Sequence, residues 1–399
     1  MISAVEASDY ANVVKTLGMV LLHRLVNVFI SLHMISIMGD LMSVYNGEQA
    51  SPDDADILRF IETSKPKICV VGTGGSGSNT TTRLSDLGVE GATLIAMNTD
   101  AHHLIRTKAA RKLLLGKKVT KGLGAGSDIK IGEEAAMESR EEIRHMISDA
   151  QLVFVTCGLG GGTGTGSAAV IAHEAKEAGA LTAAIVTLPF SSEGRVRMRN
   201  ALEGLAKLKR VTDTTIIIHN DKLLSVAPDL PINMAFRVCD EVLASATKSI
   251  VEMVTKPGMV NLDFADLRTV LKDSGYAVIG TGEGVAASDG TSRATVALEN
   301  AIRSPMVDAT LANAKKALIN IVGGESLTLR EAETIFQEVS GRIGTDALLK
   351  WGARIDEKMQ REAIRVMLVI SGVQFPEYSE EGIGAAPASL DDLEIDELS

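Results

Sequence analysis

The sequence predicts an α/β protein with a parallel sheet, a long central helix and a second, smaller α/β domain. Short buried strands alternate with helical patterns through the first half, which is the rhythm of a parallel sheet with helices on both faces. Two glycine-rich loops each follow a strand and open a helix. A helical pattern over 233–255 is bounded by Pro231 and by Pro257.

The chain begins with an unusually apolar segment, 12–38, whose polar residues fall in one half of a helical wheel. This amphipathic pattern is not a clean membrane span, because Arg24 interrupts its middle. No small-residue cleavage site follows, so a secretory signal is not indicated. Three alternatives stay open: an interfacial membrane helix, a helix that packs on protein, and an extension absent from the natural protein. In the third case the natural protein would start at Met38 or Met42.

The first half continues with a helix start at 51–63, where Ser51 can cap and Pro52 suits the first turn. A short buried strand follows at 65–71. Later strands are predicted at 93–97, 151–156, 181–187 and 214–218, and helices at 132–147 and 167–178.

The second half has its own set of elements, and its pattern stops after Gln374. Thr328 and Glu331 form a capping-box pattern for its last helix. Strands are predicted near 275–281, 316–322, 348–355 and 364–372, and helices near 291–303 and 328–341.

Charge and cysteine content exclude some classes of function. The net charge of −11 makes nucleic-acid binding a poor hypothesis, because such binding relies on Lys and Arg. Cys69, Cys157 and Cys239 are widely spaced, so neither a zinc site nor a disulfide framework is indicated. The acidic end of the chain, which also carries leucines, is either a solvated tail or a segment that docks on a partner.

The first glycine loop, Gly72 to Asn79, fits the pattern G-x-G-x-x-G. Small residues let a phosphate approach the backbone, and the helix N-terminus supplies N–H donors. Alone, this loop indicates a dinucleotide site, and Asp100 stands where a ribose-binding acid would. A tight strand-to-helix turn is the structural alternative.

The second loop, Gly158 to Ser167, changes that interpretation. Its six glycines in nine residues would be costly in a purely structural turn, because glycine loses the most backbone entropy on folding. The loop has no Lys, so backbone amides would hold the phosphates. A third small-residue stretch, Gly122 to Ser127, could cover a terminal phosphate. Three such loops favour a nucleoside triphosphate over a pyrophosphate.

Four polar residues are candidates for the rest of a nucleotide site. Glu193 and Arg197 follow a predicted strand, and Asn220 lies at a strand's carboxyl end, where ligands gather. Asp240 lies in the first turns of the long helix, and its carboxylate could accept paired N–H bonds from guanine, which adenine does not offer. A surface ion pair and an exposed helical acid are the structural alternatives.

Asp263 and Asp266 follow the long helix, three residues apart at a helix start, and therefore share one face. They could orient an attacking water or bind a cation, or they could simply cap the helix. None of the phosphate loops contains an obvious water-positioning group. The missing group would therefore come from another subunit.

These motifs resemble the FtsZ family of tubulin-like cell-division GTPases over about residues 52–374. GGGTGTG at 160–166 is similar to the family's phosphate loop and NLDFADLRTV at 261–270 to its synergy loop, while PFSSEGRVR, AMNTD, GLGAGS and NDKLL fall in the family's order. The first loop and its lead-in resemble archaeal rather than bacterial members. The bacterial membrane-tethering peptide has no match.

The resemblance implies a tubulin/FtsZ-like fold that binds GTP or GDP, with Mg²⁺ carried by the nucleotide phosphates and no dedicated protein metal site. It divides the chain into an extension (1–50), a GTP-binding domain (51–232), a central helix (233–256), a GTPase-activating domain (257–374) and a linker with an acidic tail (375–399). The residues expected at the nucleotide are Gly74, Gly75, Ser76, Gly77, Ser78, Asn79, Asn98, Asp100, Gly124, Ala125, Gly126, Gly161, Gly162, Thr163, Gly164, Thr165, Gly166, Glu193, Arg197, Asn220 and Asp240.

The resemblance also implies assembly into head-to-tail filaments, in which Asp263 and Asp266 would be catalytic on the next subunit's nucleotide. The expected partners are other copies of the chain and division-ring adaptor or membrane-tether proteins, with membrane contact through 12–38 and no nucleic acid. We expect a cytoplasmic protein concentrated at the mid-cell ring. The alternatives are a tubulin-like cell-shape GTPase and, remotely, an NAD-dependent oxidoreductase.

Overall fold

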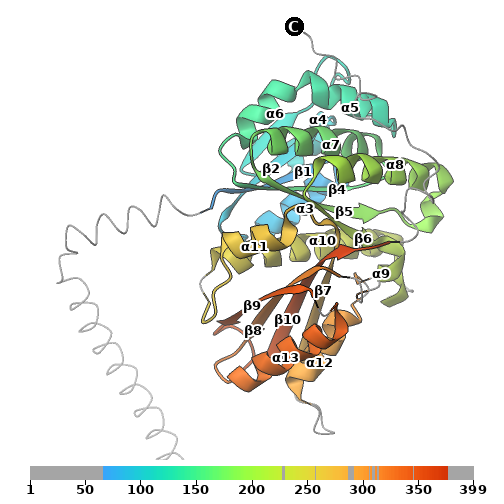
Figure 1. Cartoon of the computed structure of the whole chain (residues 1–399). Helices are drawn as coiled ribbons and strands as arrows, with labels where there is room; N and C mark the ends of the chain where they lie inside the picture. The colour runs from blue at the N-terminus through green and yellow to red at the C-terminus, as the bar shows by residue number, and fades with distance from the viewer. Residues whose placement is uncertain are drawn as a thin grey trace, which may run out of the picture. The chain divides into compact units, whose positions relative to one another are not determined.

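The computed structural model describes residues 66–375, apart from 227–229, 257, 286–291, 305, 308–310, 312–313 and 345. The strands form one ten-stranded sheet with the order β3-β2-β1-β4-β5-β6-β7-β10-β8-β9 (Figure 1). The predicted N-terminal extension, the helix start at 51–63 and the acidic tail lie outside the described residues.

The first six strands are parallel, which confirms the predicted sheet, and their order is that of dinucleotide-binding folds. Sequence reasoning missed β3, a four-residue edge strand that begins with Arg111 and Lys112 and buries only Leu113. The six strands are β1 (Ile68–Thr73), β2 (Ala92–Asn98), β3 (Arg111–Leu114), β4 (Leu152–Gly158), β5 (Leu181–Leu188) and β6 (Thr214–His219).

Helices cover both faces of this part of the sheet. One face carries α5 (Ile129–Glu138), α6 (Arg140–Ile147), α7 (Gly162–Glu177) and α8 (Arg195–Val211). The other carries α3 (Gly74–Asp86) and α10 (Ile232–Thr255), whereas α11 (Phe264–Leu271) contacts β8 and β9 of the second half. Short connections between strands and helices contain α4 (Ala101–Arg106), the 3₁₀ turn Ser191–Glu193 and α9 (Asn220–Val226).

The single helix predicted over 132–147 is two helices, and that prediction is therefore corrected. α5 ends at Glu138 and α6 begins at Arg140. The break lies at Ser139, whose hydroxyl accepts a hydrogen bond from the N–H of Gly116 at 3.0 Å. A contact with a distant loop therefore ends a helix that local periodicity would continue.

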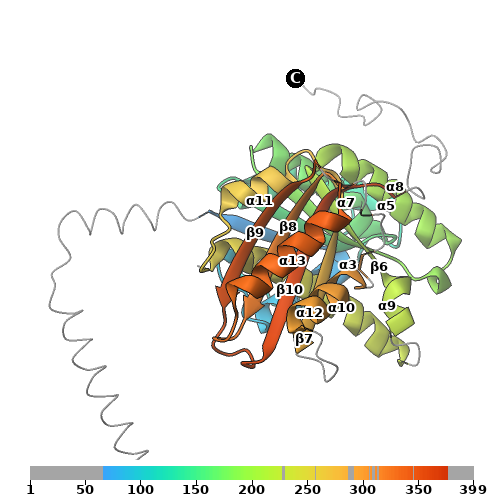
Figure 2. The ribbon, with the colours of Figure 1, turned by 60° about the horizontal axis from the view of Figure 1, so that its bottom comes forward.

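The second half contributes the other four strands: β7 (Gly275–Val285), β8 (Lys316–Gly323), β9 (Leu348–Ile355) and β10 (Ala363–Val373). β10 runs antiparallel between β7 and β8, and β9 is parallel to β8. Figure 2 shows α12 (Arg293–Ile302) and α13 (Leu329–Arg342) side by side over these strands. Thr328 and Glu331 form the predicted capping box of α13.

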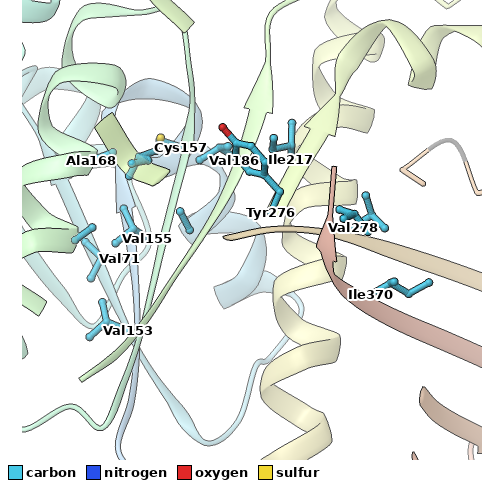
Figure 3. Packing of buried hydrophobic residues seen from close by; sticks show 14 of the residues in the cluster. Val71, Val153, Val155, Cys157, Ala168, Val186, Ile217, Tyr276, Val278 and Ile370 are labelled. Carbon is cyan, nitrogen blue, oxygen red and sulfur yellow. The ribbon is translucent and has the colours of Figure 1, made fainter. Parts of the chain in front are cut away.

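The two halves share one sheet because β7 pairs with β6 in parallel through three residue pairs, Thr214 to Ile216 against Gly275 to Ala277. The hydrophobic core is also continuous across the two halves. Alternate strand residues from β1 to β10 form one apolar cluster on one face of the sheet, from Val71 to Ile370 (Figure 3). The division of the chain at 232, 256 and 374 stays a prediction.

Candidate functional site

The two glycine loops touch where β1 and β4 end. Gly74 begins α3 with a φ of +72°, and a Cβ atom built there would lie 2.7 Å from the backbone nitrogen of Gly164. No L side chain fits that approach without backbone movement. The N-terminal turns of α3 and α7 therefore lie beside each other, and their free N–H groups form one anion-attracting edge.

Hydroxyl groups bind the two loops to the ends of the strands. Thr73 and Ser167 share a hydrogen bond of 2.6 Å, and Thr99 and Thr163 share another of 2.6 Å. Thr165 accepts the N–H of Gly160 at 2.8 Å. Three strand ends are thus fixed relative to one another before any ligand binds. Sequence reasoning did not single out Thr73, which stands within the first loop, and missed Thr99, whose only signal was its place after a strand.

The third small-residue stretch lies against the second loop. A Cβ atom on Gly162 would lie 3.0 Å from the Cβ atom of Ala125. The N–H of Gly124 donates to the carbonyl of Thr99 at 3.2 Å. By contrast, a Cβ atom on Gly161 would meet nothing within 4 Å. Small residues therefore border open space at this edge of the sheet.

Asp240 lies in α10 and contacts the first loop. It accepts hydrogen bonds from the Ser76 hydroxyl at 3.2 Å and from Nδ2 of Asn79 at 3.1 Å. Burial raises the pKa of Asp240, and the two hydrogen bonds oppose that shift. The carboxylate is therefore incompletely hydrated and can accept further hydrogen bonds from N–H groups of a ligand.

The polar network continues through a residue that sequence reasoning missed, His103. Its Nε2 lies 3.1 Å from Oδ1 of Asn79, and its Nδ1 lies 3.4 Å from Nδ2 of Asn98. Asp100 caps α4 by accepting the N–H of His103 at 2.9 Å. Asn98 also donates to Ser78 at 3.3 Å. The predicted polar residues of the first loop and of β2 thus belong to one connected set.

Phe236 is another residue that sequence reasoning missed. Its ring is 41% exposed and lies one helical turn before Asp240 on α10. The edge of the Phe190 ring packs against it, with centroids 5.3 Å apart and planes at 79°. An aromatic side chain four residues before the candidate base-binding acid was the available signal.

Glu193 and Arg197 follow β5, the first in the 3₁₀ turn and the second in α8, and Asn220 directly follows β6. Glu193 accepts the N–H of Phe190 at 2.8 Å and forms an ion pair with Arg197 at 3.1 Å. Arg197 also lies beside the second loop, because a Cβ atom on Gly160 would be 2.7 Å from its Cγ. Asn220 is buried, and its Oδ1 has no hydrogen-bond partner within the described part of the chain.

The carboxylates of Asp263 and Asp266 cap α11, so the structural alternative named above does occur. Each accepts the other's backbone N–H, at 2.8 Å and 3.3 Å. Lys350 on β9 contacts Asp266 at 2.9 Å and holds the pKa of that carboxyl below its usual range. Asp263 remains exposed.

These two carboxylates lie past the far end of α10 from Asp240. Fifteen residues separate Asp240 from Thr255, which ends the helix, and they span roughly 22 Å at 1.5 Å per residue. Within a single chain, the glycine loops therefore lie far from the Asp263–Asp266 pair.

Two family models match the chain. The model described as "Tubulin/FtsZ family, GTPase domain" matches residues 67–228, and that described as "FtsZ family, C-terminal domain" matches 275–374. The first match includes the three small-residue loops. Asp240, Asp263 and Asp266 lie between the two matches.

Individual relatives agree with the family models. The chain is 51% identical to cell division protein FtsZ 1 of Methanocaldococcus jannaschii over 86% of this chain and 94% of that protein. It is 53% identical to cell division protein FtsZ of Methanothermobacter thermautotrophicus over 81% and 84% of the two chains.

Solved structures show the same likeness. An empty FtsZ dimer from M. jannaschii matches with a TM-score of 0.75 and 52% identity, covering 81% of this chain and 92% of that one. CetZ2 from Haloferax volcanii, solved as a GTPγS-bound protofilament, shares the fold, with a TM-score of 0.69 and 20% identity over 79% and 96% of the chains. The chain belongs to the FtsZ family of tubulin-like GTPases.

Proposed function

We propose that this chain binds GTP, assembles into head-to-tail filaments in the cell-division ring, and hydrolyses GTP where two copies meet. Family membership supports the GTPase activity, and the relatives at about 50% identity are named cell division proteins. The observation that carries the hydrolysis mechanism is the separation of the glycine loops from Asp263 and Asp266 by most of the length of α10.

The triphosphate would lie along the contact between the two glycine loops. The free N–H groups at the starts of α3 and α7 would hold its oxygens, and Gly124 to Gly126 would cover the terminal phosphate. The open space beside Gly161 favours a ligand here. The unpaired oxygen of buried Asn220 would accept a hydrogen bond from a hydroxyl or N–H group of the nucleotide rather than from its phosphates.

The guanine base would lie at the α10 end of this site. Asp240 would accept the N1 and N2 hydrogens of guanine, and the exposed ring of Phe236 offers a flat apolar surface for stacking. Adenine lacks this pair of donors, so the same carboxylate would select against ATP. Glu193 and Arg197, beside the second loop, would contact the nucleotide from the α8 side.

Hydrolysis would need the carboxylates of a second copy. Asp263 and Asp266 would orient the attacking water on the terminal phosphate of their neighbour's nucleotide. An interface between a pocket on one copy and a different surface on the next is heterologous, so it extends into a filament.

Mg²⁺ would take its ligands mainly from the nucleotide and from water. The described residues contain no group of three or more His, Cys, Asp or Glu side chains that could hold a metal ion. When bound, the ion would neutralise charge on the phosphates. The chain's own part is to position those phosphates through the backbone of the glycine loops.

The proposed setting is the cytoplasm at the mid-cell division ring, with adaptor or tether proteins as partners. None of the helices that the structure describes has both the length and the apolarity to cross a bilayer. Residues 12–38 could make an interfacial contact, with Arg24 near anionic headgroups. Equal binding to anionic vesicles by the full chain and by a chain starting at Met42 would reject that contact.

Right-angle light scattering with GTP, GDP or NAD tests the proposal. We expect GTP alone to raise scattering, with a later fall as GTP is consumed. Assembly with NAD, or no assembly with GTP in the presence of Mg²⁺, would contradict it. An oxidoreductase and a cell-shape GTPase are not favoured, because relatives at 48–53% identity are named cell division proteins.

A further inference from the structure

His103 lies between two amide side chains at the base end of the site. Its Nε2 is 3.1 Å from Oδ1 of Asn79, and Nδ2 of Asn79 donates to Asp240 at 3.1 Å. Its Nδ1 is 3.4 Å from Nδ2 of Asn98. We propose that His103 is a positioning residue for guanine selection, which acts through Asn79 to hold the Asp240 carboxylate in place.

The surroundings fix the direction of every hydrogen bond in this chain of contacts. A carboxylate only accepts, so Asn79 must turn its NH₂ group toward Asp240 and its oxygen toward His103. A backbone N–H only donates, so Oδ1 of Asn98 faces the N–H of Asp100, at 3.2 Å, and its NH₂ group faces His103.

The tautomer of His103 follows from these two amides. Nε2 faces an oxygen and must carry the proton, whereas Nδ1 faces an NH₂ group and must accept. The neutral ring with the proton on Nε2 therefore satisfies both neighbours at once. The capping bond from the N–H of His103 to Asp100 holds the backbone beneath the ring.

This arrangement matters because Asn79 is otherwise poorly held. Asn79 is exposed, and without a donor at Oδ1 its amide can rotate away from Asp240 or turn its oxygen toward the carboxylate. The Asp240 carboxylate would then lose a fixed partner before it meets the base. The inference rests on the proposed function, because it takes Asp240 as the group that reads guanine.

The test compares GTP with ITP, whose base lacks the 2-amino group of guanine. His103→Phe keeps a flat ring and removes the donor, and His103→Gln restores an N–H. His102→Phe is the matched control, because His102 is the exposed neighbour of His103. The measurement is the ratio of the dissociation constants for ITP and GTP in each protein.

We expect His103→Phe to lower that ratio roughly threefold to tenfold, as for one lost hydrogen bond. His103→Gln should recover most of it, and His102→Phe should leave it unchanged. A purely structural role would weaken both nucleotides equally and leave the ratio constant, which would overturn the inference.

A double-mutant cycle tests the route through Asn79. His103→Phe in an Asn79→Ala background should cause no further change in the ratio, because its intermediary is gone. An additive loss would overturn the inference. Asp240→Asn separates the two proposals. If this variant also leaves the ratio of dissociation constants unchanged, the assignment of Asp240 to the base site is wrong. If the ratio falls in Asp240→Asn but not in His103→Phe, only the proposal about His103 is rejected.

Discussion

Asp240, the proposed guanine-binding residue, is a charged side chain whose burial opposes folding. Burial raises its pKa from 3.8, while Ser76 and Asn79 stabilise the charged form only in part. A carboxyl whose pKa is raised by folding adds stability below its unfolded pKa and loses it as the pH rises through the folded value. The ionised group therefore costs stability at neutral pH in the nucleotide-free protein.

The first prediction follows from that cost. Asp240→Asn should unfold at higher urea than the wild type at pH 7 without nucleotide, and this difference should grow as the pH rises from about 4 and then level off. GTP affinity should fall roughly 10- to 150-fold, because bonds to a charged acceptor are lost. Urea unfolding across pH and a titration with GTP measure both effects. Stability curves parallel at every pH would reject the account.

Single residues could be predicted where a motif marks them. The glycines stand in recognisable patterns and Asp240 is selected through the family resemblance, and the structure brings them to one edge of the sheet. His103 and Thr99 could not be found this way. Their roles come from contacts with Asn79 and Thr163, which lie 24 and 64 residues away along the chain, and no local pattern encodes such contacts.

At the scale of elements, individual glycines of the two loops differ in what they do. Gly74 lies at φ +72° and against Gly164, so the fold itself needs it. Gly161, at φ −85° and ψ 171°, has ordinary extended backbone and open space where a side chain would lie. Only the second kind is explained by a ligand.

The contrast gives a paired prediction. Gly161→Val should fold with an unfolding free energy within about 1 kcal/mol of the wild type, because only the N-cap preference is lost. Its GTP affinity should nevertheless fall at least tenfold, since the side chain fills the phosphate space. Gly74→Val should lose stability even without nucleotide. Thermal unfolding and GTP titration measure these effects; normal GTP binding by Gly161→Val would contradict the loop assignment.

Elements could be predicted where local pattern decides them. The strands β4 to β6 and the helix α10 lie within a few residues of their predicted ranges, because long apolar runs and bounding prolines mark them. The junction of the two halves could not be predicted. Periodicity shows that a strand exists, whereas the pairing of Thr214 with Gly275 depends on the whole fold.

At the scale of the whole molecule, α10 would set the geometry of the proposed reaction. It places Asp240 against the first glycine loop and ends roughly 22 Å further on, before Asp263 and Asp266. A monomer would therefore bind GTP without hydrolysing it, and the rate per chain would depend on protein concentration. Each contact between copies would then complete a hydrolysis site, and hydrolysis at that contact would in turn favour disassembly of the filament.

The sharpest variant for this claim is Asp263→Asn. Asparagine is as good an N-cap as aspartate, so α11 should be kept while the charge is removed. The variant should bind GTP normally and assemble, but hydrolyse GTP on the order of 10²-fold more slowly, because the group that orients water is lost.

Mixing Asp263→Asn with Gly161→Val is the most direct test of the shared site. The first keeps an intact pocket and the second keeps intact carboxylates, so a complete site forms only where the two variants meet. We predict that the mixture hydrolyses GTP faster than the sum of the two proteins measured alone. A mixture no faster than that sum, or a normal rate from Asp263→Asn alone, would contradict hydrolysis between subunits.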